Sequence, residues 1–357
     1  LGGGITPDHS ILGRFIARHA EAFCGSFFSA ITESVLTRTG SGRERLAWDE
    51  TVLEAMSSRF ALLKREALEA QRKQLTELAE ESAERAGLDR AHTALAERPK
   101  AKAVVVGEPE AGLLQLKNGR GTRPAYQVAV LANEARVVVD AHVHSTSEQA
   151  ALAETLERLD GAQTRELLLD AGFNSYAVLE CALEKEISLL CPEQSEDEEG
   201  KKSGLFALRD FHYVEDGDYY LCPAQAQLHP CRRFAGNPEK GLRAYVQYAS
   251  SACGSCERRS QCTRAEARTI QRSAGQEFKE AMRQVMAQPK ARRVFAQRKA
   301  MVEPVFAMLR ERQGLHRFRR RGLSGVRLEF RLHLTAYNLG RALAHARRAL
   351  EATAQPR

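Results

Sequence analysis

The pattern of apolar and polar residues predicts helices at the start of the chain and a strand after them. Residues 8–40 show apolar positions at helical spacing after Pro7-Asp8, which is a helix-start signal. The next apolar run, in RERLAWDETVLEA, ends at Asp49 and fits a strand that enters a turn. Residues 54–98 are rich in Ala, Leu, Glu, Gln and Lys, which predicts a long charged helix or a helical hairpin.

Strands and helices then alternate along the chain. Residues 99–123 fit a loop, and residues 125–144 fit two strands joined by a turn near residues 132–134. The next segments are predicted as helix, strand, helix and strand, at residues 147–159 (with Ser145 or Ser147 as the helix cap), 165–170, 175–186 and 187–192. A hairpin followed by such alternation predicts an α/β fold, in which a mixed sheet carries helices on its faces.

The second half of the chain has a different organisation. A charged loop is expected at residues 193–205, a loop-rich insert at 222–262, and helices at 266–350 with breaks at Pro289 and at 314–325. Because the chain begins with Leu1 rather than Met, we expect its first helical region to be truncated. We expect four parts: helical region 1–42, α/β core 43–192 with a helical insertion at 54–100, cysteine-rich insertion 193–265, and basic helical part 266–357.

Positive charge is concentrated in the C-terminal third. The net charge of the whole chain is +7, whereas residues 290–348 alone hold sixteen Lys or Arg against three acidic residues. This density favours nucleic-acid binding, with a solvated helix face as the alternative. Since no run approaches 18 apolar residues and no secretory signal is visible, we expect no membrane span and a cytoplasmic protein.

Three acidic residues lie in contexts that suit a metal site. Asp49 and Asp170 follow apolar, strand-like runs, and Glu303 lies on a helix-like run rich in arginine. Carboxylate oxygens are ligands that Mg²⁺ prefers, and a pair of such ions can stabilise both oxygens in a phosphodiester substitution. Taken singly, each acid also fits a turn or a surface ion pair.

Asp140 is a rival first acid. It lies on a predicted strand and shares a face with His142 and His144, because strand side chains alternate. We prefer Asp49 and expect Asp140 to face solvent or to cap the edge of the sheet.

Five of the eight cysteines fall between residues 222 and 262. Cys253 and Cys256 have the spacing of a zinc knuckle, Cys262 follows, and either Cys222 or Cys231 could complete a tetrahedral set. The alternative is a set of free thiols packed in a small insert.

Several strings, in order along nearly the whole chain from Pro7, resemble the DDE transposases of bacterial insertion sequences, specifically the eleven-eighty-two-type branch. PDHSILGRF resembles the N-terminal helical segment of that family, and WDETVLEAMSSRF its first-acid motif. LLLDAGFNS resembles the second-acid motif, and FAQRKAMVEPVFAMLRERQGLHRFRRRGL the third. VRLEFRLHLTAYNLGRAL matches in character at the C-terminus. Cys222-Pro223 also matches a Cys-Pro element of the family. With this resemblance, the preferred candidate zinc ligands are Cys222, Cys253, Cys256 and Cys262.

The resemblance implies an RNase H-like catalytic core at residues 43–192. Asp49, Asp170 and Glu303 would be the catalytic ligands of Mg²⁺ or Mn²⁺, and Arg298 would contact the DNA backbone. Arg310 stands where the family has lysine, Phe295 where it has tyrosine, and Asn133 where an aspartate is frequent. Glu50 and Ala307 replace glycines, and Glu50 adds a negative charge beside the first ligand.

The tract Arg317-Phe318-Arg319-Arg320-Arg321 is a candidate DNA-binding segment, because guanidinium groups bind phosphate in a bidentate manner. We expect a nucleoid-associated bacterial transposase that cuts DNA at insertion-sequence ends and transfers the strands. Two ends must be held together, so we expect a homodimer on DNA. The rivals are a catalytically impaired DNA-binding protein derived from a transposase, and a metal nuclease that cleaves without joining.

Overall fold

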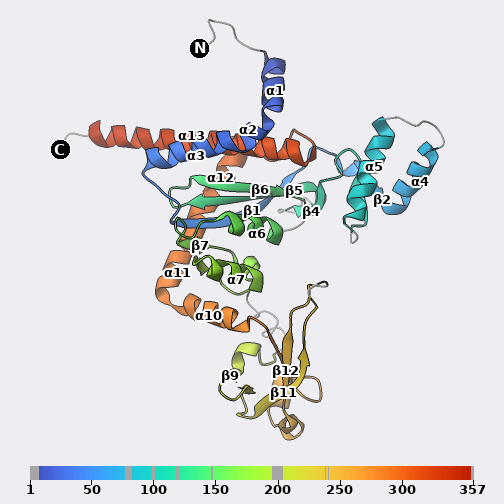
Figure 1. The fold of residues 1–357 in the computed structure, drawn as a ribbon, viewed down its shortest axis with the longest axis vertical. Coiled ribbons are helices and arrows are strands. Elements are labelled where there is room, and N and C mark those ends of the chain that lie inside the picture. The colour runs from blue at the N-terminus through green and yellow to red at the C-terminus, as the bar shows by residue number, and fades with distance from the viewer. Residues whose placement is uncertain are drawn as a thin grey trace. The chain divides into compact units, whose positions relative to one another are not determined.

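The computed structural model describes most of the chain, which forms two compact units of mixed α and β structure (Figure 1). The first unit comprises the described parts of residues 1–169, 185–189 and 293–357, and the second those of residues 170–184 and 190–292. The described residues are 8–76, 83–98, 101–116, 121–145, 148–194, 204–237, 239 and 241–354.

The first unit is built on a mixed sheet with β1 and β5 at its centre. The strand order is β4–β5–β1–β7–β8, and β6 also pairs with β5. β5 pairs antiparallel with β1, β4 and β6, whereas β7 pairs parallel with β1. The strands are β1 (Arg45–Glu54), β4 (Gly112–Leu116), β5 (Gly121–Asn133), β6 (Val138–His144), β7 (Glu166–Leu168) and β8 (Ser188–Leu190).

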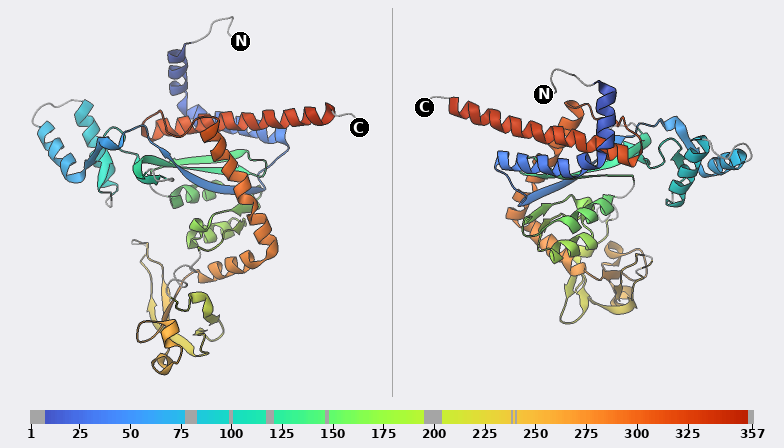
Figure 2. Two further views of the ribbon diagram at one scale, coloured as in Figure 1. Left: turned by 180° about the vertical axis from the view of Figure 1, so that it is seen from behind. Right: turned by 45° about the horizontal axis from the view of Figure 1, so that its top comes forward.

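Helices of the first unit cover both faces of this sheet. Residues 124–133 of β5 are all buried, as expected for a strand with both faces covered. Figure 1 shows α3 and α13 on one side of the sheet and α6 on the other, and Figure 2 shows α12 crossing the sheet. These helices are α3 (Ser26–Thr39), α6 (Glu148–Arg158), α12 (Gln297–Glu311) and α13 (Gly322–Ala354).

The N-terminal helices and α13 pack together. Asp8 caps the first helix, since its Oδ1 accepts a hydrogen bond of 2.7 Å from the backbone N–H of Ile11. Asn338 of α13 is fully buried and bonds both the N–H (2.9 Å) and the carbonyl (2.8 Å) of Val138 at the start of β6. These bonds satisfy backbone groups of a sheet edge. The first two helices are α1 (His9–Arg18) and α2 (Ala20–Cys24).

A small module follows β1 in the first unit. Its two helices enclose an apolar cluster with a two-stranded sheet, around Leu68, Leu88, Leu95 and Val104. The elements are the 3-10 helix η2 (Arg59–Ala61), β2 (Leu62–Lys64), α4 (Arg65–Thr76), α5 (Ala83–Ala96) and β3 (Ala103–Val105).

The second unit combines helices with a five-stranded antiparallel sheet of order β13–β12–β11–β10–β9. Its core contains Phe211, Tyr220, Leu228, Tyr248 and Ile270. The strands are β9 (His212–Val214), β10 (Tyr219–Leu221), β11 (Gln227–Phe234), β12 (Tyr245–Ala249) and β13 (Thr269–Ser273). The helices are η3 (Ala171–Phe173), α7 (Tyr176–Glu184), η4 (Leu208–Asp210), η6 (Ser251–Ser255), α9 (Arg259–Cys262) and α10 (Gln276–Ala287), and α11 (Pro289–Phe295) crosses the boundary between the units.

The main alternation of strands and helices confirms the sequence prediction, and five local expectations are wrong. β1 continues through Asp49 to Glu54, so Asp49 does not end a strand. The helical segment expected from residue 54 begins only at Arg65, and the loop expected at 99–123 contains β3 and β4. The loop-rich insert is a sheet, and its last strand, β13, occupies residues expected to be helical.

Parts of other predictions lie outside the described residues. These are Pro7, Ser147 and residues 195–203 of the charged loop. The breaks near Pro289 and Gly314 are confirmed, because α10 ends at Ala287 and α12 ends at Glu311. Within the described part of the chain, no helix has both the length and the apolar character that crossing a membrane requires.

Candidate functional site

Asp49 lies in the middle of β1, on the face that α12 covers. It stands opposite Val130 of β5 in the antiparallel register, and its side chain is 23% exposed. Thr51 shares this face because side chains alternate along a strand, and its hydroxyl accepts a hydrogen bond from Arg310 of α12. A central strand is a more rigid support for a ligand than the turn expected from the sequence.

Arg298 of α12 contacts this part of β1 through its guanidinium group. Its side chain is only 7% exposed, and its Nη1 donates to the carbonyl of Trp48 at 3.0 Å and to Oδ1 of Asp49 at 3.3 Å. A guanidinium so deeply buried is not presented to a DNA phosphate. The expected backbone contact of Arg298 is therefore corrected to an internal role, in which it orients the carboxylate of Asp49.

Glu303 is an exposed residue of α12. The helix packs through a buried stripe that includes Val302, Val305 and Leu309. Glu303 and Arg310 are seven residues apart, so they project from nearly the same side of the helix, next to that stripe. Arg310 donates to Thr51 of β1, whereas Arg298, the residue that contacts Asp49, projects about 140° around the helix from Glu303.

Asp170 is the first residue of the second unit. It is exposed and caps η3, because its Oδ1 accepts a hydrogen bond of 2.6 Å from the backbone N–H of Ala171. The thiol of Cys191 donates to its carbonyl oxygen at 3.2 Å. Asp170 thus occupies the strand-to-turn position that its sequence context predicts.

The three acids supply the hard oxygen donors that Mg²⁺ and Mn²⁺ prefer, and each has an exposed fraction of side chain. Among the residues that the structure describes, no group of three or more His, Cys, Asp or Glu side chains is already arranged to hold a metal ion. The donor chemistry therefore fits such a cation, while the coordinating arrangement is not preformed.

Glu50 places its negative charge on the opposite face of β1 from Asp49. Its carboxylate accepts hydrogen bonds from Nε1 of Trp48 (3.0 Å) and Nε2 of Gln127 (2.6 Å), and lies 3.8 Å from Nε2 of His144. The glycine-to-glutamate departure is thus accommodated by a buried polar network. It adds no carboxylate to the Asp49 face.

Of the other departures from the family pattern, the structure explains Asn133 but not Phe295 or Ala307. Asn133 is buried and fixes the turn between β5 and β6, because its amide bonds the N–H of Val137 (2.9 Å) and the carbonyl of Gly42 (2.8 Å). Phe295 is half-buried at the end of α11, and Ala307 is exposed on α12. Nothing in the structure explains the last two.

Asp140 is an ion-pair centre rather than a solvent-facing residue. Its carboxylate lies 2.8 Å from Nη2 of Arg158, 2.9 Å from Nη2 of Arg331 and 3.2 Å from Nε2 of His142. Burial alone would raise the pKa of Asp140, but the hydrogen bond with His142 and the two arginines hold it well below its ordinary value. The carboxylate is thus committed to protein cations, which supports Asp49 as the first acid.

The arginine tract at 317–321 is fixed through its backbone. Phe318 is buried against Tyr126, with ring centroids 6.0 Å apart. The carboxylate of Glu329 accepts hydrogen bonds from the backbone N–H groups of Arg319 and Arg320, at 3.0 and 2.8 Å. Arg317 is used internally, since its Nε donates to the carbonyl of Ala55 at 2.9 Å.

The side chains of Arg319, Arg320 and Arg321 make no hydrogen bond or ion pair with any residue in the described parts of the chain. Arg319 and Arg321 are exposed and Arg320 is half-exposed. Arg298, Arg310 and Arg317 are therefore engaged within the first unit, whereas the side chains of Arg319, Arg320 and Arg321 are not.

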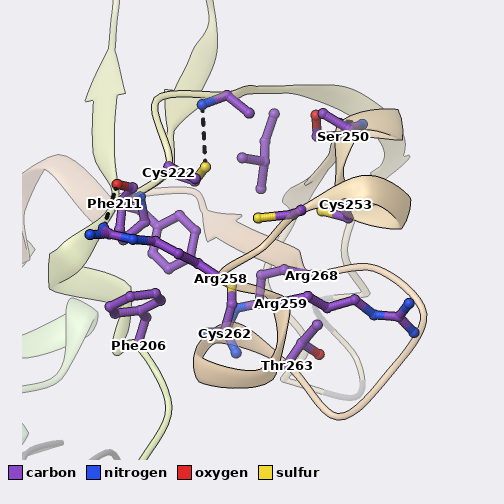
Figure 3. A pocket seen from close by; sticks show the side chains of 16 residues that line it. Phe206, Phe211, Cys222, Ser250, Cys253, Arg258, Arg259, Cys262, Thr263 and Arg268 are labelled. Carbon is purple, nitrogen blue, oxygen red and sulfur yellow. Dashed lines mark hydrogen bonds between the residues drawn. The ribbon is translucent and has the colours of Figure 1, made fainter.

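Four cysteines of the second unit line one small cavity, as Figure 3 shows for Cys222, Cys253 and Cys262. Burial raises the pKa of the Cys262 thiol, Arg268 lowers it, and the three other thiols raise it. The four sulfur atoms are thus close enough to interact electrostatically. The fourth member is Cys256.

Thr51, Glu329 and Arg268 were missed by the sequence analysis. Thr51 belongs to the Asp-x-Thr string, so its place in the motif was a usable signal. Glu329 is one of only three acids among residues 290–348, which also could have marked it. Nothing in the sequence singled out Arg268 from the other arginines of the insert.

Comparison with known families gives one match. The model of a transposase DDE domain matches residues 221–343, a range that includes Glu303, the arginine tract and all four cysteines of the cavity. Asp49 and Asp170 lie outside the matched range. No curated protein and no solved structure matches the chain. The match supports a DDE transposase, and with it a role in transposition and DNA recombination.

Proposed function

We propose that the chain is a transposase that cleaves DNA at the ends of an insertion sequence and joins the freed ends to target DNA. The observation that carries this proposal is the placement of Asp49 under α12, the helix that bears Glu303 and lies within the matched DDE domain. The first and third acids of the motif thus belong to the same pair of packed elements.

The strand register adds support for Asp170 as the second acid. β7 runs parallel to β1, with Leu168 opposite Ala47. Asp170 follows Leu168 by two residues, and Asp49 follows Ala47 by two residues. The strand order β6–β5–β1–β7–β8, antiparallel on one side of β1 and parallel on the other, also supports an RNase H-like core.

Asp49, Asp170 and Glu303 would hold the Mg²⁺ or Mn²⁺ ions. These ions, when bound, stabilise charge on the attacking and leaving oxygens of the phosphodiester. The chain's own residues position the reaction. Arg298 restrains the carboxylate of Asp49, and Arg319, Arg320 and Arg321 supply charge for the DNA backbone. Because two element ends must be held at once, the active species would be a homodimer on DNA.

A second candidate is a transposase-derived protein that binds DNA without cutting it. The ion pair between Arg298 and Asp49 favours it, because a metal must compete with the guanidinium for that carboxylate. A third outcome is a nuclease that cleaves without joining.

One assay separates the three functions. The full chain is incubated with Mg²⁺, a labelled DNA that carries the ends of the element, and a supercoiled target plasmid. Joined product supports the transposase, cut product alone the nuclease, and a shifted but uncut DNA the binding protein. Asp49→Asn, Asp170→Asn and Glu303→Gln should each abolish chemistry, whereas Glu311→Gln, at the exposed end of the same helix, should not.

A further inference from the structure

The cavity of the second unit has the size and lining of a site for one metal ion. Its volume is about 30 Å³, enough for a single ion or water molecule. Four thiols reach it from three segments of the chain (Figure 3). Cys222 follows β10, Cys253 and Cys256 belong to η6 and its end, and Cys262 ends α9.

Hydrogen bonds tie these segments together around the cavity. Nη1 of Arg258 donates to the carbonyl of Pro223 at 3.0 Å, which joins the loop after Cys256 to the loop after Cys222. The backbone N–H of Ala226 donates to Sγ of Cys222 at 3.3 Å. This bond fixes the orientation of the Cys222 sulfur beside the cavity.

The structure also decides between the two cysteines that the sequence left open as the fourth ligand. Cys231 is exposed, is absent from the cavity lining, and donates its thiol to the carbonyl of Gln247 at 3.3 Å. Cys222 lines the cavity with the other three. The donor set is therefore four sulfurs that share one space.

Arg268 provides an independent sign of a negatively charged occupant. It lines the same cavity, and its Nε is buried without a hydrogen-bond partner among the described residues. A buried donor with no partner is costly. Arg258 and Arg259 line the cavity as well, and no acidic residue does. A divalent ion with four thiolates carries a net charge of −2, which such a cationic surround would stabilise.

We propose that this cavity binds one structural zinc ion through four thiolates, those of Cys222, Cys253, Cys256 and Cys262. Zinc favours soft thiolates in tetrahedral geometry, and four protein ligands leave no position for substrate. The side chains are not already arranged for coordination, so they close on the ion as it binds and release their thiol protons to solvent. The ion would fasten η6 and α9 to the end of β10.

The test is the metal content of the full chain purified from zinc-supplemented cells. One zinc per chain is expected by elemental analysis, and adding a chelator should make four further thiols reactive toward a thiol reagent. Double replacement Cys253→Ser/Cys256→Ser should remove the zinc, and Cys222→Ser should weaken its retention against chelators at least tenfold. Cys231→Ser is the matched control and should retain it.

Cobalt substitution keeps the test decisive even if the serine variants fold poorly. The wild-type chain, stripped and reloaded with Co²⁺, should show the absorption of tetrahedral cobalt with thiolate charge transfer. A zinc-free chain whose thiol reactivity does not change when a chelator is added, disulfides between these cysteines detected by mass, or zinc lost only in Cys231→Ser would each overturn the proposal. DNA cleavage is not part of any readout, so this result is independent of the proposed function.

Discussion

The guanidinium of Arg298 lies 3.3 Å from the carboxylate of Asp49 and is almost entirely buried between α12 and β1. The same guanidinium also bonds the carbonyl of Trp48. One side chain therefore links the helix of the third acid to the strand of the first.

Arg298→Ala should destabilise the first unit by about 2–4 kcal/mol, because it leaves a carbonyl and a carboxylate without their donor. Trp48, the sole tryptophan, is fully buried in this unit, so its fluorescence during urea unfolding reports the change. Lys299→Ala, at the neighbouring exposed position, should cost less than about 0.5 kcal/mol. Equal effects of the two replacements would show that Arg298 does not link the two elements.

Asp140→Asn should cost about 2 kcal/mol at pH 7, because Arg158 and Arg331 lose their shared partner. The folded-state pKa of Asp140 is lowered, so its stabilisation is present above the unfolded value, about 4, and is lost as the pH falls below it. The difference in unfolding free energy between wild type and variant should therefore shrink as the pH falls from 5 to 3. A difference that stays constant over that range would contradict the ion-pair assignment.

Joint replacement of Arg319, Arg320 and Arg321 by alanine should weaken DNA binding at every sequence tested. Each lost phosphate contact lowers the slope of log K against log salt by roughly 0.9, so the slope should fall by about 2–3. Fluorescence anisotropy at several salt concentrations measures it. The triple variant Lys64→Ala/Arg90→Ala/Lys102→Ala removes as much exposed charge from the α4–α5 module and is the control. Should both variants lose the same slope, the tract has no specific part in binding.

Mn²⁺ should quench the fluorescence of Trp48, because this paramagnetic ion would be bound by Asp49, the next residue in the chain. Asp49→Asn should weaken the apparent affinity for Mn²⁺, measured from the quenching, at least tenfold. Glu311→Gln should leave that affinity unchanged. This titration needs no DNA and no turnover. Quenching that survives in Asp49→Asn would place the ion elsewhere.

The sequence predicted the alternating part of the fold better than the segments around it. β5, β6, α6, α7 and α12 were foreseen, because their periodicity is strong and local. The extension of β1 beyond Asp49 was missed, since Asp, Glu and Thr do not form an apolar run. Only the pairing of β1 with β5 shows that these polar positions continue a strand.

The site shows the same division between local and tertiary information. The motifs identified the acids and the cysteines, but not which arginines are free to meet DNA. Arg298 and Arg319 look alike in sequence. They differ because Arg298 is buried between α12 and β1, whereas the backbone N–H of Arg319 is fixed by Glu329. Such distinctions depend on packing between residues far apart in the chain.

The strand-transfer assay with the element's ends tests the central claim most directly. The account predicts Mg²⁺-dependent cutting and joining by the wild-type chain and by Glu311→Gln, and loss of both steps in Asp49→Asn, Asp170→Asn and Glu303→Gln. Folded variants of these three acids that still cut and join DNA would contradict it.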